Sequence, residues 1–174
     1  TTAKIVTNSG GALIELGELK KALEFIEIGK KYFEVSNNKP GLASIYTLLA
    51  RIYEKQDDRF KALENEKKGL GLSKETNNER LAAQINLFLA SIYKEQKDLA
   101  NASKFYFAAL QDAQKINEIV IQATSLLGLS SIQSELNNPS VAIVYGKKSV
   151  NQFQNLRGNI KNLDKETQQI LLEN

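Results

Sequence analysis

The stretch LARIYEKQDDRFKA, residues 49–62, returns along the chain at intervals of 40 residues. A second copy, LASIYKEQKDLANA, occupies residues 89–102, and a third, LSSIQSELNNPSVA, occupies residues 129–142. A more divergent copy precedes them and ends at Ala22. Self-similarity at a fixed period of this length is the signature of a repeat architecture, so the period decides the fold before any local pattern does.

The positions that return describe pairs of helices. Residues 22, 62, 102 and 142 are all Ala, and residues 29, 69, 109 and 149 are Gly, Gly, Ala and Ser. Such small side chains predict two close approaches of helix backbones in each unit. Leu at 49, 89 and 129 and Ile at 52, 92 and 132 lie three residues apart, on one face of a helix. Apolar residues are spaced by three and four throughout, which indicates helices and no strands.

Turn and cap residues recur at the same interval. Residues 18, 58, 98 and 138 are Glu, Asp, Asp and Asn, and three of the four are favoured helix N-caps. Gly17, Asp57, Lys97 and Asn137 precede them as the expected turns, and Asn at 37, 77 and 117 suits the left-handed conformation that ends a helix. We predict helices at residues 3–16, 19–36, 40–56, 59–75, 79–96, 99–116, 119–136 and 139–155, and a ninth, shorter helix near 160–173.

The composition argues against several classes of function. The 174 residues are 42% hydrophobic and 25% charged, which predicts one soluble globular domain. The net charge of +3, with no basic run of five or more, argues against nucleic acid. No apolar segment reaches the roughly 20 residues of a membrane helix. The chain does not begin with Met, so we expect it to be a fragment of a longer protein.

Cysteine, histidine, methionine and tryptophan are absent from the sequence. Thiolate and imidazole chemistry and the usual zinc ligands are therefore excluded, and no set of carboxylates, lysines or hydroxyls stands out as an active site. We expect no enzymatic activity, no metal and no cofactor. The absence of cysteine is typical of a reducing compartment, which favours a cytoplasmic location.

The helix pairs resemble the tetratricopeptide repeat (TPR). The match consists of Leu49-Ala50 with Tyr53 and Ala62, and of Leu89-Ala90 with Tyr93, Ala102 and Tyr106. This chain departs from the family pattern in having no Trp, no Pro at the end of a unit, and a period of 40 instead of 34. The resemblance implies an all-α, right-handed α-α superhelix, a TPR-like solenoid. Its four helix-turn-helix repeats would lie near residues 1–38, 39–78, 79–118 and 119–157, followed by a capping helix at 160–173.

The end of the array carries a second resemblance. Residues 142–151, AIVYGKKSVN, lead to RGNI at 157–160 and LDKETQ at 163–168. This segment looks like the end of the repeat region in bacterial CHAT-domain proteins, in which a caspase-like protease follows the repeats. The resemblance implies a non-catalytic protein- or peptide-binding scaffold, the repeat arm of such a protein. The alternative is a regulatory peptide-sensing domain of a signalling protein.

In TPR proteins the first helix of each unit lines a concave surface, and the resemblance implies a binding groove for a protein or peptide there. Arg51 and Lys94 would supply charge, and Leu87 and Leu127 an apolar strip. A solvated face without a ligand is the alternative interpretation. The set contains no Asn, which a peptide-clamping receptor would be expected to carry. The candidate residues are Ser44, Thr47, Arg51, Glu54, Gln84, Leu87, Ser91, Lys94, Thr124, Leu127, Ser131 and Ser134.

Two further features have competing interpretations. Asp57-Asp58 could suggest a metal site, but Asp58 is better explained as a helix cap, because no further acidic residue stands at loop-ligand spacing. The first repeat has no evident cover, so Ile5, Val6 and Leu13 are expected to lie open. We therefore predict self-association through the uncapped N-terminal repeat.

Overall fold

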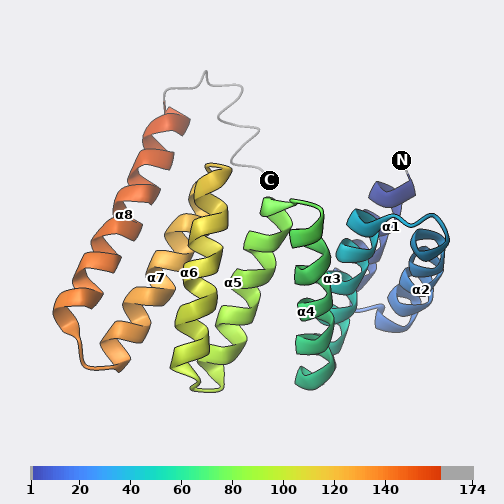
Figure 1. Cartoon of the computed structure of the whole chain (residues 1–174), viewed down its shortest axis with the longest axis horizontal. Helices are drawn as coiled ribbons and strands as arrows, with labels where there is room; N and C mark the ends of the chain where they lie inside the picture. The colour runs from blue at the N-terminus through green and yellow to red at the C-terminus, as the bar shows by residue number, and fades with distance from the viewer. Residues whose placement is uncertain (1, 162–174) are drawn as a thin grey trace. The chain divides into compact units, whose positions relative to one another are not determined.

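The structure, a computed structural model, describes residues 2–161, and in this range every regular element is an α-helix (Figure 1). The predicted boundaries of seven helices agree with it to within one residue, because the cap and turn residues identify both ends of each helix. The eight helices are α1 (Thr2–Glu15), α2 (Leu19–Val35), α3 (Lys39–Lys55), α4 (Arg59–Glu75), α5 (Glu79–Glu95), α6 (Leu99–Lys115), α7 (Ile119–Glu135) and α8 (Pro139–Lys161).

The prediction that the eighth helix ends at 155 is wrong. α8 continues to Lys161, so residues 160 and 161 belong to it and do not begin a separate capping helix. Gly158 lies inside the helix, and a Cβ there would meet open space. A single exposed glycine weakens a helix by about 1 kcal/mol without ending it. The rest of the predicted ninth helix, residues 162–173, lies outside the described residues.

One type of joint connects all these helices. A residue with positive φ stands every 20 residues, at Gly17, Asn37, Asp57, Asn77, Lys97, Asn117 and Asn137, with φ between 49° and 76°. The next N–H then donates to a carbonyl five residues back, as from Asp58 to Tyr53 (2.8 Å) and from Asn138 to Gln133 (2.8 Å). This is the Schellman ending of a helix. The predicted left-handed positions are confirmed.

Side-chain caps begin several helices. The Asp58 carboxylate accepts from the Lys61 N–H (3.1 Å), and the Asp98 carboxylate accepts from the Asn101 N–H (3.0 Å). Hydrogen bonds from Lys61 hold the pKa of Asp58 below its usual value. Glu18, which is not among the three favoured caps of this column, makes no such bond. A glutamate side chain is one methylene longer than the favoured caps. The assignment of Asp58 as a helix cap is confirmed.

The chain divides into two compact units, residues 1–89 and 90–174, and the boundary falls within α5. In the first unit, α1 packs on α2 and α3, and α3 packs on α4. Gly29 and Gly69 make the expected close approaches: a Cβ at Gly29 would lie 2.4 Å from Val6 Cγ1, and one at Gly69 would lie 3.3 Å from the Ala43 carbonyl oxygen. The core of this unit consists of Val6, Ile14, Ala22, Ile26, Phe33, Ile45, Leu48, Leu49 and Ile52.

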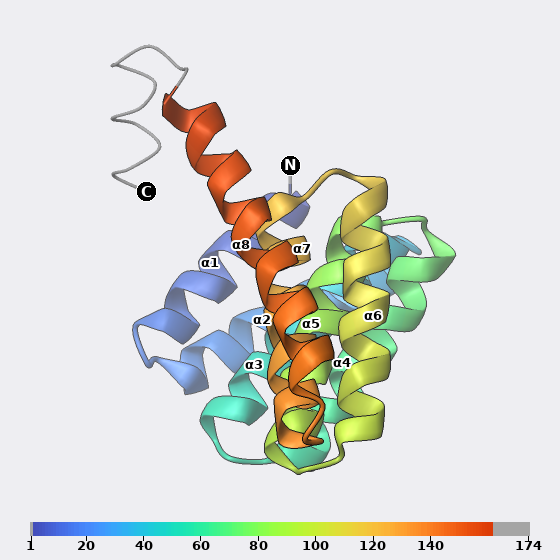
Figure 2. The same ribbon diagram turned by 90° about the vertical axis from the view of Figure 1, so that its left-hand side faces the viewer.

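In the second unit, α7 packs against both α6 and α8 (Figure 2). The hydroxyl of Ser149 donates to the Ala123 carbonyl (2.7 Å), and that of Ser130 donates to the Ala142 carbonyl (2.7 Å). These contacts require small side chains where α7 and α8 meet, as the repeat pattern predicts. Ala102, Ala109, Leu129 and Ile132 are fully buried in the same unit.

The open N-terminal surface is smaller than predicted. Ile5 is 62% exposed, as expected, but Val6 is buried because Gly29 on α2 leaves room for it. Leu13 is half-buried. Of the three residues, Ile5 therefore carries the self-association prediction, which stays a prediction.

Candidate functional site

The twelve predicted groove residues, here called the first-helix surface, lie on α3, α5 and α7 and outside the buried core. Glu54, Gln84, Leu127 and Ser134 are exposed, and the other eight are half-buried. The positions of α3 lie in the first unit and those of α7 in the second. Within each helix they follow a spacing of three and four residues, which places them on one side of it. A partner could therefore reach these side chains in each unit.

Several of these side chains already have partners within the chain. The hydroxyls of Ser44 and Thr47 donate to carbonyls four residues earlier, and Thr124 does the same on α7. Arg51 forms an ion pair with Glu15, and Lys94 Nζ lies 4.0 Å from a Glu135 carboxylate oxygen. The surface is consequently polar and nearly neutral, and Leu127, 55% exposed, is its largest open apolar group.

A buried carboxyl group belongs to the same unit as the α3 part of this surface. Glu66 on α4 is 1% exposed, and its Oε2 has no hydrogen-bond partner. The pKa of Glu66 is raised to about 8, chiefly by burial and also by the charge of Glu54, while the charge of Arg51 opposes the shift. The group is therefore mostly protonated at neutral pH, which avoids the cost of a buried charge.

The second unit contains a groove that the sequence analysis did not find. Phe107, Leu110 and Gln114 form a stripe along α6 at positions i, i+3 and i+7. A matching stripe on α8 consists of Tyr145, Lys148, Gln152, Asn155 and Asn159. The floor is α7, through Ile119, Gln122 and Leu126. Helical spacing thus lines both walls, and we call this feature the amide groove.

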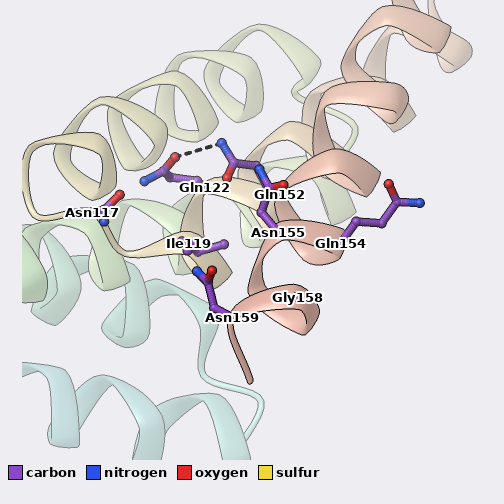
Figure 3. Close-up of a pocket in the computed structure, with 8 residues that line it drawn as sticks. All are labelled: Asn117, Ile119, Gln122, Gln152, Gln154, Asn155, Gly158 and Asn159. Carbon is purple, nitrogen blue, oxygen red and sulfur yellow. Dashed lines mark hydrogen bonds between the residues drawn. The ribbon is translucent and has the colours of Figure 1, made fainter. Parts of the chain in front are cut away.

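One end of the amide groove is almost entirely made of side-chain amides (Figure 3). This pocket has a volume of about 520 Å³. Gln122, 5% exposed, donates to the Ala113 carbonyl (3.2 Å) and accepts from Gln152 Nε2 (3.2 Å). Gln154 points away from the others in Figure 3. The pocket is lined by Asn117, Ile119, Gln122, Gln152, Gln154, Asn155, Gly158 and Asn159.

The other end of the amide groove is mixed in character. This pocket of about 380 Å³ shares Gln152 and Asn155 with the first. Phe107 and Tyr145 meet edge to face across it, with ring centroids 6.1 Å apart. Lys148 is the one charged residue among those lining the two pockets. No motif could have revealed the groove, because its amides come from α6, the α6–α7 joint, α7 and α8, and Asn159 lies beyond the predicted end of α8.

Comparison with known proteins supports the repeat assignment. Residues 83–111 match the model of the tetratricopeptide repeat family. These residues run from α5 through the joint into α6, which is one helix pair. Residues 83–111 thus match a TPR-type repeat. No curated protein matches the chain.

Two solved structures share the fold. BtubC (BKLC) from P. vanneervenii is 19% identical, with a TM-score of 0.75, over 90% of this chain and 65% of that one. A Signal Transduction ATPase with Numerous Domains (STAND) protein with a tetratricopeptide repeat sensor, from Pyrococcus horikoshii, is 20% identical, with a TM-score of 0.75, over 91% of this chain and 25% of that one. The chain thus spans less than two thirds of either relative. The predicted all-α, TPR-like repeat fold is confirmed.

The same comparisons do not test the predicted connection to CHAT-domain proteins. Neither structure is described as a CHAT-domain protein, so that resemblance stays a prediction. Within the part of the chain that the structure describes, no helix is both long enough and apolar enough to cross a membrane.

Proposed function

We propose that this chain is a non-catalytic binding module whose first-helix surface accepts a protein or peptide segment. The observation that carries the proposal is Leu127, a large apolar side chain held 55% exposed beside the half-buried Thr124 and Ser131 of α7. An exposed leucine with small neighbours gives an incoming side chain direct access to the helix. Because packing already fixes the helix, binding requires little ordering of this surface.

Selection from random peptides displayed on phage tests the proposal. The full chain should enrich specific sequences, and Leu127→Lys should weaken their binding about 10-fold, as expected when an interface residue worth about 1.4 kcal/mol is lost. Val144→Lys is the matched control: Val144 is 51% exposed on α8 and lines neither pocket of the amide groove. Failure to enrich any sequence, or equal losses in both variants, would contradict the proposal.

The proposal also concerns the longer protein to which this repeat module would belong. The resemblance of residues 142–168 supports a repeat arm of a bacterial CHAT-type protease. Sequencing the reading frame beyond Asn174 tests this directly. A His and a Cys in strand-rich sequence are expected there. A histidine-kinase or DNA-binding module would reject the protease connection.

A regulatory peptide-sensing domain is the second candidate, favoured by the fold shared with a STAND protein that has a tetratricopeptide repeat sensor. A sensor must differ between its free and bound states, whereas a scaffold need not. Limited proteolysis of the chain with and without an enriched peptide separates the two functions. New protection far from the bound peptide supports a sensor, and protection confined to the contact supports a scaffold.

A further inference from the structure

The amide groove has the chemistry to recognise peptide bonds. A side-chain amide carries one carbonyl acceptor and an NH₂ donor, the same groups that a peptide bond presents. The groove already contains one such pair, Gln152 to Gln122 at 3.2 Å. Asn155 and Asn159 project from the same face of α8, and within residues 2–161 their side chains make no hydrogen bond to another residue. They are available to an incoming group.

Charge restricts the class of ligand. The amide pocket is lined by no ionisable side chain, and Lys148 alone adds a charge in the neighbouring pocket. Phosphates and carboxylates are bound in proteins mainly by arginine, lysine or clustered backbone N–H groups. The groove therefore suits a neutral ligand with several donors and acceptors.

Spacing favours an extended chain over a helix. Residues three and four apart on α8 stand about 5–6 Å apart, which places Gln152, Asn155 and Asn159 in a row. Every second residue of an extended chain repeats at about 6.6 Å. An extended segment also has unpaired peptide groups, whereas those of a helix are already bonded to each other. Each amide of the row can thus meet a successive outward-facing peptide group.

We propose that the amide groove binds an extended, uncharged polypeptide segment. Gln152, Asn155 and Asn159 pair with its backbone, and one apolar side chain enters beside Phe107 and Leu110. This site is separate from the first-helix surface, because it is lined by α6 and α8 and by none of the twelve residues of that surface.

The test uses the full chain and the neutral peptide acetyl-Gly-Leu-Ser-Gly-amide. Titration is followed by ¹⁵N–¹H NMR on the side-chain NH₂ signals of Gln152, Asn155 and Asn159, which should shift saturably. Asn155→Ala should weaken binding about 2- to 10-fold, the loss of one hydrogen bond. Asn155 is exposed, so this variant should fold, which circular dichroism checks. Gln96→Ala, an exposed amide at the α5–α6 joint outside both pockets, should bind as the original chain does.

Three results would overturn this assignment: no saturable shift up to the solubility limit of the peptide, equal shifts with maltose or inorganic phosphate, or an equal loss in Gln96→Ala. Leu127→Lys separates the two sites. It should weaken binding of the phage-selected peptides about 10-fold and leave binding of the neutral tetrapeptide unchanged, so either site can fail while the other stands.

Discussion

Glu66 occupies a column of the repeat that holds Ile26 and Tyr106 in neighbouring copies. All three side chains are buried, but only Glu66 is ionisable near neutral pH. The repeat pattern predicts that the residue at this column is buried. It does not predict the raised pKa, because only one copy has a carboxyl group there. An aliphatic residue would fill the same space and would carry no ionisable group.

The stability of the chain should fall as pH rises from about 4.5 to 8, because Glu66 holds its proton in the folded state and loses it when unfolded. The slope contributed by one such group is at most about 1.4 kcal/mol per pH unit. Glu66→Gln should remove this slope and be the more stable protein at pH 8 in urea unfolding. Glu64→Gln, exposed on the same helix, is the control and should keep the slope. A parallel pH dependence in Glu66→Gln would contradict the assignment.

Gly128 is the glycine of the second unit at which an added Cβ would meet its nearest neighbour at the shortest distance. A Cβ there would lie 2.3 Å from the ring of Tyr106, whose side chain is buried and cannot swing away. Gly128→Ala should therefore destabilise the chain by about 1–3 kcal/mol through overpacking. Gly71→Ala, in open space within α4, should instead stabilise by about 0.5–1 kcal/mol. Urea midpoints measure both changes. Combining Gly128→Ala with Tyr106→Leu should cost less than the sum of the single changes.

At the scale of the element, the sequence predicted the boundaries of seven helices closely. The joints between helices consist mostly of residue types with a known backbone preference. Asn and Gly tolerate positive φ, and Asp and Asn cap the next helix. Lys97 shows the limit of this reasoning: its φ of 62° follows from its place in the period and not from its residue type. α8 runs past its predicted end at 155 and through Gly158 to Lys161, because one exposed glycine weakens a helix without ending it.

Asn137 should tolerate glycine but not a β-branched residue. Its φ of 59° lies in the left-handed region, where a side chain other than that of glycine, asparagine or aspartate costs about 1–2 kcal/mol. Asn137→Val should lower the stability by that amount in thermal unfolding, whereas Asn137→Gly should leave it unchanged or raise it. Equal effects of the two substitutions would indicate that the joint does not require this conformation.

The amide groove shows why a candidate site can escape sequence reasoning. Its residues come from α6, the α6–α7 joint, α7 and α8. Asn117 recurs as Asn37 and Asn77, but no other copy has an amide at the columns of Gln122, Gln152, Asn155 and Asn159. The first-helix surface was predicted because it repeats every 40 residues. Periodicity thus reveals what the repeats share, and a site formed by one unit alone depends on the packing of that unit.

At the scale of the whole chain, the 40-residue period should determine which segments can be deleted without loss of cooperative unfolding. Deleting residues 79–118 removes one helix pair and brings Asn78 to Ile119 with the joint pattern intact. This variant should still unfold cooperatively, with a lower midpoint, since repeat stability is approximately a sum over units and interfaces. Deleting residues 99–118 removes one helix and sets two first helices in succession. It should lose cooperative unfolding by circular dichroism, and similar behaviour of the two deletions would contradict the 40-residue unit.

The central claim is that the first-helix surface binds a polypeptide segment, and hydrogen–deuterium exchange with a phage-selected peptide tests it most directly. We predict slower exchange in the first helices, above all around Leu127 on α7, and little change in α2, which contributes nothing to this surface. Leu127→Lys should reduce the protection at the same peptide concentration. Protection confined to α6 and α8, or none with any selected peptide, would contradict the claim.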